Sequence, residues 1–286
     1  MPLIALTLLV AAAIAHASWN LLVKHAAASR NFNWFYSLGT VIVYGPLAAF
    51  IAYRAWPFLS VPVAACLLST GAVHVGYSAA LQRGYRAADI SVVYPVARGT
   101  GPLLAFAGAS LLFHEAFSWL ALLGLLLVVG GVFLIAGGSR VFRAGGARIG
   151  LKWGVMTGIL IATYTLIDGY SVRILLVSPI LVDYAGNVVR SIALAPMALR
   201  DPRALVTDYK RHWRQALGVS VLGPFAYVLV LFAMTLAPVS HIAPAREVSM
   251  VIGAYFGSRI FKEGARRTRT TAACLILAGV VCLTLS

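Results

Sequence analysis

Apolar residues fill this chain in long runs that short polar links separate. A helix needs about 20 apolar residues to cross the hydrocarbon core of a bilayer. Ten runs approach or reach that length and so predict an all-α membrane protein with ten transmembrane helices. They cover residues 2–23, 32–53, 60–82, 89–113, 117–137, 151–172, 178–199, 214–236, 240–261 and 270–286.

The charge balance indicates which partners the protein has. Charged residues make up 11% of the chain and the net charge is +15, whereas soluble domains carry about 25% charged residues. Such a positive charge in a soluble protein would suggest nucleic acid. Here Lys and Arg gather in the links, as they do in the cytoplasmic loops of membrane proteins. We therefore expect the lipid bilayer as a partner and no nucleic acid.

The segment Ile90–Glu115 is unusual because charged and helix-breaking residues interrupt its apolar run. They are Pro95, Arg98, Gly99, Gly101 and Pro102. An arginine at the centre of a lipid-facing helix costs roughly 3 kcal/mol or more. Proline and glycine also leave backbone groups that other parts of the protein must satisfy. We predict a helix that is broken at these residues and that faces a central cavity.

A shift of 148 positions superposes this segment on a second one. Val96-Ala97-Arg98 then matches Pro244-Ala245-Arg246, Ser110 matches Ser258, Phe113 matches Phe261, Glu115 matches Glu263, and Gly131-Val132 matches Gly279-Val280. The chain is therefore predicted to contain two homologous five-helix repeats, residues 1–137 and 151–286, joined by a linker at 138–150. The repeated Glu115 and Glu263 suggest a structural duty, such as capping the next helix.

Lys and Arg are distributed unequally between alternate links. The links after the odd-numbered segments hold 17 of them, and the links after the even-numbered segments hold only 2, Arg54 and Arg173. The positive-inside rule places the odd-numbered links in the cytoplasm and both termini on the periplasmic side of a bacterial inner membrane. Five helices per repeat then invert the second repeat. Inverted repeats with interrupted helices are typical of secondary transporters, whose substrate site lies near the midplane.

Several polar side chains share helix faces and are candidates for that site. His74, Tyr77 and Ser78 have spacings of 3 and 4 and so lie on one face. They could bind a substrate, or they could form a hydrogen-bonded cluster between helices. Tyr227 in segment 214–236 is isolated, and we interpret it as a packing residue.

Charged and aromatic residues in other segments extend the candidate site. Arg98 lies four residues after Tyr94, and its guanidinium could hold a carboxylate through two parallel hydrogen bonds. A structural ion pair, or snorkelling of Arg98 to the interface, is the alternative. The remaining candidates are Trp19 and Asn20 in the first segment and Tyr164 and Asp168 in the sixth. Aromatic walls with a few polar groups suit a small amphiphilic ligand, although plain packing would also explain the two rings.

The segment 240–261 combines a proline with two adjacent charges, Arg246 and Glu247. Pro244 predicts a break that could serve gating. Arg246 is expected to pair with Asp168 or with Asp183. Glu247 is either a proton carrier or the partner of Arg190 or Arg98.

These features resemble the drug/metabolite transporter superfamily, and within it the ten-helix exporters of the EamA type. The resemblance is carried by the two five-helix halves, the sequence His16-Ala17-Ser18-Trp19-Asn20, the proline-containing fourth segment, and Glu115 and Glu263. It implies export of small metabolites by alternating access, with amino acids, including aromatic ones, as the favoured substrates. The adjacent Arg246 and Glu247 depart from the family pattern and leave the choice between uniport and proton antiport open.

The sequence is also compatible with two other functions. A carrier of drugs or phosphorylated metabolites would have the same fold, and Arg98, Arg190 and Arg246 could bind phosphate. A membrane-embedded enzyme is the remote alternative, since paired catalytic groups are not evident. Nucleotide-binding and metal-binding motifs are also missing, and the three cysteines lack metal spacing. We therefore expect no catalytic residues, no metal and no cofactor. We also expect a monomer, because ten helices can enclose a cavity without a second subunit.

Overall fold

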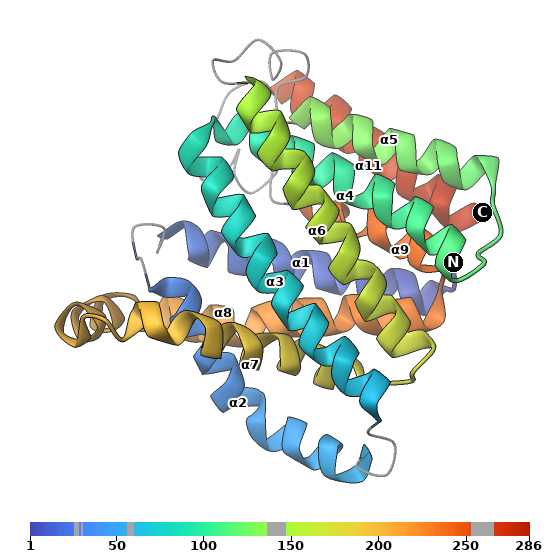
Figure 1. Ribbon diagram of the computed structural model, residues 1–286. Coiled ribbons are helices and arrows are strands. Elements are labelled where there is room, and N and C mark those ends of the chain that lie inside the picture. Colours follow the sequence, from blue (N-terminus) through green and yellow to red (C-terminus); the bar gives the residue numbers. More distant parts are fainter. Residues whose placement is uncertain (26–28, 30, 56–59, 136–146, 253–265) are drawn as a thin grey trace.

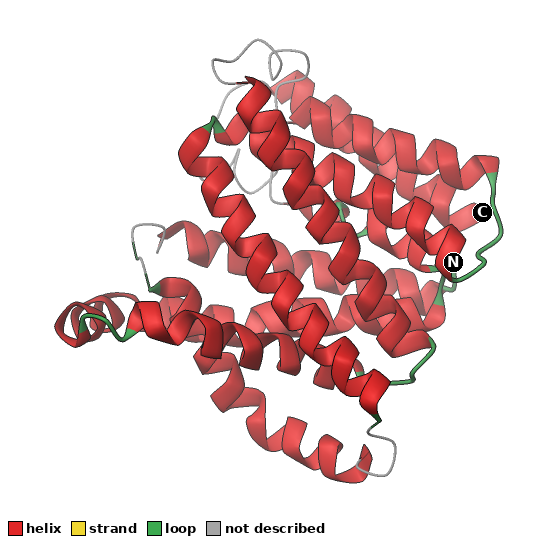
Figure 2. Cartoon of the chain, in the orientation of Figure 1, coloured by secondary structure: helices red, strands yellow, loops and turns green. Residues whose placement is uncertain are grey.

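A computed structural model describes the chain except for residues 26–28, 30, 56–59, 136–146 and 253–265, and every regular element in the described part is a helix (Figures 1 and 2). The helices are α1 Leu3–His25, α2 Phe32–Ala55, α3 Val61–Ala87, α4 Ile90–Leu112, α5 Trp119–Ile135, α6 Ala147–Arg173, α7 Pro179–Ala198, α8 Pro202–Leu236, α9 Val239–Ala245 and α11 Arg266–Leu285. The helical fold class predicted from the sequence is thus confirmed for these residues.

Several helices suit a membrane. By length and composition, α1, α2, α3, α6 and α8 can each cross a bilayer, and α5 and residues 270–285 of α11 form shorter apolar helices. Large apolar side chains such as Leu3, Leu111 and Leu285 point outward, each with about three quarters of its surface exposed. Apolar side chains turned outward in this way fit a lipid environment. The number of crossings and the inversion of the second repeat stay predictions.

Two predicted links are partly helical. Residues 200–214 were expected to form a polar link, yet α8 begins at Pro202 and includes most of them. The Asp201 side chain accepts a hydrogen bond from the Ala204 backbone N–H at 3.0 Å, and proline is well tolerated in the first turn. At the other link, α6 begins at Ala147, inside the predicted linker 138–150. The Asp201 cap therefore helps to extend α8, and charged residues with good helix propensity lie in the first turns of both helices.

The break predicted at Pro95–Pro102 is wrong, because α4 continues through both prolines. A proline removes one backbone hydrogen bond, and packing against neighbouring helices can offset that loss. The glycines serve this packing. A Cβ atom on Gly101 would lie 2.7 Å from Ile161 Cγ2 of α6, and one on Gly99 would lie 3.0 Å from a ring carbon of α5. These glycines thus let neighbouring helices approach α4 closely.

A break does follow Pro244. Helix α9 ends at Ala245, Arg246 and Glu247 form a turn, and residues 248–252 are helical again. The Glu247 N–H donates to the Pro244 carbonyl at 3.0 Å, which closes the turn. The predicted segment 240–261 is therefore interrupted at its two charged residues. The repeat residues Ser258, Phe261 and Glu263 lie outside the described residues.

The helices pack in a pattern that follows the expected repeat. Helix α3 packs against α6 and α7, while α8 packs against α1 and α2. Shifting by 148 residues exchanges α1 with α6, α2 with α7, and α3 with α8, so these contacts map onto one another. In Figure 1, α4, α5, α9 and α11 gather on one side, and α3 and α6 cross in front of α1 and α8. Two related halves would produce this arrangement.

Helices α5 and α11 touch through glycines. A Cβ atom on Gly124 would lie 2.7 Å from the Gly279 carbonyl oxygen, and one on Gly279 would lie 2.6 Å from the Gly124 carbonyl oxygen. Gly131 similarly meets the Ala272 carbonyl at 2.8 Å. Small residues let membrane helices approach backbone to backbone, where van der Waals packing holds them together. This interface therefore depends on the absence of side chains.

Helix α6 carries a glycine stripe against α4. Gly150, Gly154 and Gly158 meet Val92, Val96 and Thr100, with would-be Cβ contacts of 2.6–2.7 Å. The spacing of four residues places all three glycines on one helix face. The stripe brings α4 and α6 close together, and α6 also packs against α3 and α8.

Glu115, in the segment after α4, forms hydrogen bonds with the start of α9 and with the end of α6. Its Oε1 accepts from the Val239 backbone N–H at 2.7 Å, and its Oε2 accepts from the Ser240 N–H at 3.0 Å. Arg173 at the end of α6 donates to the same carboxylate. A carboxylate at a helix N-terminus satisfies free N–H groups and interacts favourably with the helix dipole. Glu115 therefore caps α9, in line with the structural role that its repetition suggested.

The glycine contact between α5 and α11 can be tested by adding one methyl group. Gly279→Ala would push a Cβ atom against the Gly124 carbonyl, and we expect a loss of about 1–3 kcal/mol in unfolding free energy. Gly130→Ala on the partner helix α5 is the control, because a Cβ atom there meets nothing within 4 Å. That control should be neutral or slightly stabilising, by up to about 1 kcal/mol. Thermal unfolding in detergent measures both, and equal melting temperatures would contradict the packing.

Candidate functional site

Four aromatic rings from three helices form a contiguous group, called here the aromatic cluster. It consists of His74 and Tyr77 on α3, Tyr164 on α6 and Tyr227 on α8. The His74 and Tyr164 rings stack with centroids 4.2 Å apart. Tyr77 meets Tyr164 edge-on at 5.8 Å, and Tyr227 meets His74 edge-on at 5.8 Å. The cluster unites residues of both predicted repeats.

Packing of small and apolar residues holds the aromatic cluster in place. Ala97 of α4 and Ile161 of α6 are buried beside Tyr164, and Tyr77 and Tyr227 pack against them. His74 is further fixed by its ring Nδ1, which lies 2.9 Å from the Thr70 carbonyl oxygen. The spacing in the sequence correctly predicted that His74 and Tyr77 lie on one helix face. Tyr227, in contrast, was predicted to be a packing residue only. Its counterpart 148 positions earlier is Ala79, so the repeat gave no signal for it.

Asp168 lies one turn after Tyr164 and is fully buried, with 0% of its surface exposed. The Tyr227 hydroxyl donates a hydrogen bond to Asp168 Oδ2. The other oxygen, Oδ1, accepts no well-aligned hydrogen bond from the described residues, although the Thr70 side chain lies near the carboxylate. Arg173, the cation that follows Asp168 on α6, binds Glu115 instead. A buried carboxylate oxygen without a partner is costly, and it marks a place where a donor could bind.

Three charges meet beside the aromatic cluster and are called here the charged triad. Arg98 Nε of α4 lies 3.0 Å from Glu247 Oε2, and Arg246 Nε lies 3.8 Å from Glu247 Oε1. Glu247 is 0% exposed. Of the partners considered from the sequence, Arg98 is thus the one that Glu247 contacts. The expected pairing of Arg246 with Asp168 or Asp183 is wrong, because the turn after α9 directs its side chain toward Glu247 instead.

Hydrogen bonding within the triad is incomplete. Arg98 Nε, Arg246 Nε and Nη2, and both Glu247 oxygens are buried without a hydrogen-bond partner among the described residues. Arg98 Nε is close enough to Glu247 for a hydrogen bond but its N–H is not aligned with the carboxylate, whereas Arg246 Nε, at 3.8 Å, is too far away. Buried charges need hydrogen bonds as well as opposite charges. Ionisable residues inside a membrane protein mark functional sites, so these free donors and acceptors single out the triad.

The triad and the aromatic cluster form one continuous site. The Arg246 guanidinium carbon lies 5.8 Å from the Tyr164 ring centroid, and the Arg98 guanidinium carbon lies 5.7 Å from the Tyr94 centroid. A cation over an aromatic face is attracted by the ring electrons. The Arg98 and Arg246 side chains keep 14% and 10% of their surface exposed. Only a small part of either side chain is thus exposed, and the donors that lack hydrogen-bond partners are themselves buried.

Other predicted residues lie elsewhere or bond locally. Trp19 packs against the buried group Phe32, Phe35, Ala216 and Val219 and meets His16 edge-on at 4.8 Å. Asn20 is exposed and donates to the His16 carbonyl at 2.9 Å. Ser78 is half-buried, and its hydroxyl donates to the His74 carbonyl, also at 2.9 Å. In this arrangement packing and local backbone bonds account for these three side chains.

The polar face of α7 holds α2 in place. Arg190 Nη1 donates to the Tyr36 hydroxyl at 3.0 Å, and Trp34 Nε1 donates to the Ser191 carbonyl at 3.1 Å. The Arg190 guanidinium also lies over the Tyr36 ring, at 5.7 Å from its centroid. The alternative in which Arg190 pairs with Glu247 is therefore wrong. These bonds join equivalent helices of the two predicted repeats.

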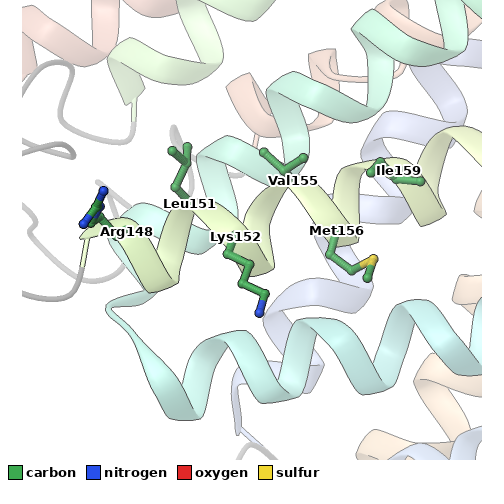
Figure 3. A pocket seen from close by; sticks show the side chains of 6 residues that line it. All are labelled: Arg148, Leu151, Lys152, Val155, Met156 and Ile159. Atoms are coloured by element: carbon green, nitrogen blue, oxygen red, sulfur yellow. The ribbon is translucent and has the colours of Figure 1, made fainter.

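A groove of about 480 Å³ runs along α6 (Figure 3). Its lining residues are Arg148, Leu151, Lys152, Val155, Met156 and Ile159. The opposite face of the same helix carries the glycine stripe and the buried Tyr164. The groove is thus a second surface feature, distinct from the candidate site.

Comparison with known proteins finds a family match in the second half of the chain. Residues 148–285 match the EamA-like transporter family. A solved structure described only as "Crystal structure of protein" shares the fold, with a TM-score of 0.75 and 15% sequence identity over 98% of this chain and 97% of that one. A search of curated proteins found no match. The EamA-like part supplies Tyr164, Asp168, Tyr227, Arg246 and Glu247, and the first half supplies His74, Tyr77, Tyr94 and Arg98.

The hydrogen bond between Tyr227 and Asp168 can be tested by removing one oxygen. Tyr227→Phe keeps the ring but leaves Asp168 without a bonded donor, so we expect a loss of about 2 kcal/mol in unfolding free energy. The control, Tyr77→Phe, keeps its ring contact with Tyr164 and should change stability far less. Thermal unfolding in detergent compares the two. A Tyr227→Phe protein as stable as the control would contradict the bond.

Proposed function

We propose that the protein exports small amphiphilic metabolites, above all amino acids including aromatic ones, across the bacterial inner membrane by alternating access. The match of residues 148–285 to a transporter family supports a membrane transporter of small molecules and favours a carrier over an enzyme. One observation carries the choice of substrate. Arg246 presents Nε and Nη2, the two donors on one edge of its guanidinium, without hydrogen-bond partners, beside the aromatic cluster.

A zwitterionic amino acid needs both kinds of group that the site supplies. Its carboxylate and ammonium lose water when they enter the protein, and each then needs a charged or hydrogen-bonding partner. The Nε and Nη2 edge of Arg246 can hold the carboxylate through two parallel hydrogen bonds. Asp168 Oδ1 and the tyrosine rings can receive the ammonium. The faces of His74 and Tyr77 offer apolar walls to the substrate side chain.

Glu247 supplies a route for coupling transport to protons. Its carboxylate lies between Arg98 and Arg246, and a substrate carboxylate on Arg246 would compete with it. Protonation of Glu247 removes its charge and releases both guanidiniums for the substrate. The turn after α9 lets this residue move without unwinding a longer helix. In this proposal the first and second repeats reorient around the charged triad, with both termini on the periplasmic side.

A second candidate rests on the two arginines together. Arg98 and Arg246 both bury donors without hydrogen-bond partners, and a phosphate ester with two negative charges would satisfy both. A phosphorylated metabolite therefore competes with an amino acid as the substrate. It would not use Asp168, because two negative charges repel. A cationic drug would use the rings and Asp168 but would be repelled by the arginines.

Transport by purified protein in liposomes tests the proposal. Wild-type protein should exchange radiolabelled phenylalanine for internal phenylalanine faster than protein-free liposomes do. Arg246→Lys keeps the charge but loses the two-donor edge, so phenylalanine exchange should fall about tenfold or more while phenylalaninamide exchange changes less than twofold. The control, Arg190→Lys on the structural face of α7, should affect acid and amide alike.

Three outcomes would count against this function. Equal loss of acid and amide exchange in Arg246→Lys, at an unchanged melting temperature, would remove Arg246 from carboxylate binding. Wild-type exchange of glucose 6-phosphate without exchange of phenylalanine would favour the phosphorylated substrate. Exchange of a cationic dye alone would favour drug export.

A further inference from the structure

The groove on α6 has a cationic end and an apolar remainder. Arg148 and Lys152 lie at its start, and Leu151, Val155, Met156 and Ile159 continue along the helix. Their spacings of three and four residues place them on one side of α6, and Lys152 and Met156 leave the helix in the same direction (Figure 3). Most of these side chains are exposed even though four of them are apolar. Such a surface is suited to lipid rather than to water.

The length of the groove matches one leaflet of a bilayer. Arg148 and Ile159 are eleven residues apart, which corresponds to roughly 16 Å along a helix. Half of the hydrocarbon core measures about 15 Å. A lipid whose headgroup meets the two cations would therefore lay its acyl chain along the whole apolar part. The opposite, buried face of α6 packs against α4, so among the described residues the groove lies on the outward side of the helix.

The cationic end lies among further positive charges. The last turn of α3 contacts the start of α6, since a Cβ atom on Gly84 would lie 3.0 Å from Trp153 Cβ. Arg83 and Arg86 flank this contact and are exposed. Tryptophan is enriched at the membrane interface, which suits the position of Trp153. The charge distribution of the sequence assigns this end to the cytoplasmic side, where anionic lipids are held by clusters of Lys and Arg.

We propose that this groove is a binding site for one anionic phospholipid of the cytoplasmic leaflet. The phosphate of the headgroup binds Arg148 and Lys152, and one acyl chain lies along Leu151, Val155, Met156 and Ile159. Charge selects the headgroup, because each basic residue near the membrane surface adds attraction for an anionic lipid. The bound lipid packs against α6, whose far face carries Tyr164 and Asp168. The site is separate from the transport pathway and does not depend on which substrate is carried.

Native mass spectrometry of the full-length protein tests the site. The detergent-solubilised protein is mixed with phosphatidylglycerol or with phosphatidylcholine of identical acyl chains, and the bound fraction is measured. We expect the first lipid to bind about tenfold more tightly. Arg148→Gln with Lys152→Gln should abolish the preference. The control, Arg203→Gln with Lys210→Gln, removes two exposed positive charges from α8 and should keep it.

A second variant tests the apolar half of the groove without changing charge. Val155→Trp fills the space between Leu151 and Ile159 with an indole ring, and it should reduce phosphatidylglycerol binding about fivefold or more. Thermal unfolding without added lipid checks that every variant is folded. As a further arm, water-soluble glycerol 3-phosphate, which lacks acyl chains, should not displace the lipid at equal concentration.

Several results would contradict either the headgroup contact or the acyl-chain contact of this site. Equal binding of the two lipids, or a preference that survives loss of Arg148 and Lys152, excludes headgroup selection at the groove. The same loss in the α8 control would mean that overall charge alone attracts the lipid. Unchanged binding to Val155→Trp, or displacement by glycerol 3-phosphate, would show that no acyl chain occupies the groove.

Discussion

The contact between Glu247 and Arg98 is the interaction on which the candidate site depends. It places a fully buried carboxylate between two guanidiniums, 3.0 Å from Arg98 and 3.8 Å from Arg246. Inside a membrane protein such charges are costly and usually pair with one another, with backbone carbonyls or with water. The turn after Ala245 makes the contact possible, because it lets two adjacent residues direct their side chains to a common point. The same turn brings Arg246 over Tyr164, so the charged triad and the aromatic cluster share one residue.

Close helix packing supplies the rigid frame for this polar site. The glycine stripe Gly150–Gly158 holds α4 against α6, and Gly124 meets Gly279 where α5 touches α11. Glu115 then fixes the start of α9 by capping its N–H groups and by binding Arg173. Because membrane helices gain little from the hydrophobic effect among themselves, these short-range contacts determine how the charged residues meet. The cost of the polar interior is thus offset by packing at sites that carry no charge.

Much of this could be predicted from the sequence, and the failures have physical causes. Apolar runs located the helices, and Pro244 marked the break after α9, because hydropathy and proline act locally. Periodicity assigned His74 to an inward face, but it could not name partners, since the same face can meet several helices. Tyr227 and the Asp168 hydrogen bond were therefore missed or left open. The continuous α4 and the glycine stripe show the same point: glycine in a membrane helix signals a close neighbour as readily as a break.

A double-mutant cycle between Arg98 and Glu247 tests the central contact most directly. Melting temperatures are measured for Arg98→Gln, Glu247→Gln and the double variant in one detergent. Each single change leaves Arg98 or Glu247 without the other, whereas the double change removes both charges and leaves Arg246 as it is in Glu247→Gln. We predict that the double variant has a higher melting temperature than Glu247→Gln. Its loss in melting temperature, relative to the wild type, should also be smaller than the sum of the losses in the two single variants. Strictly additive losses would mean that Arg98 and Glu247 do not interact, and would contradict it.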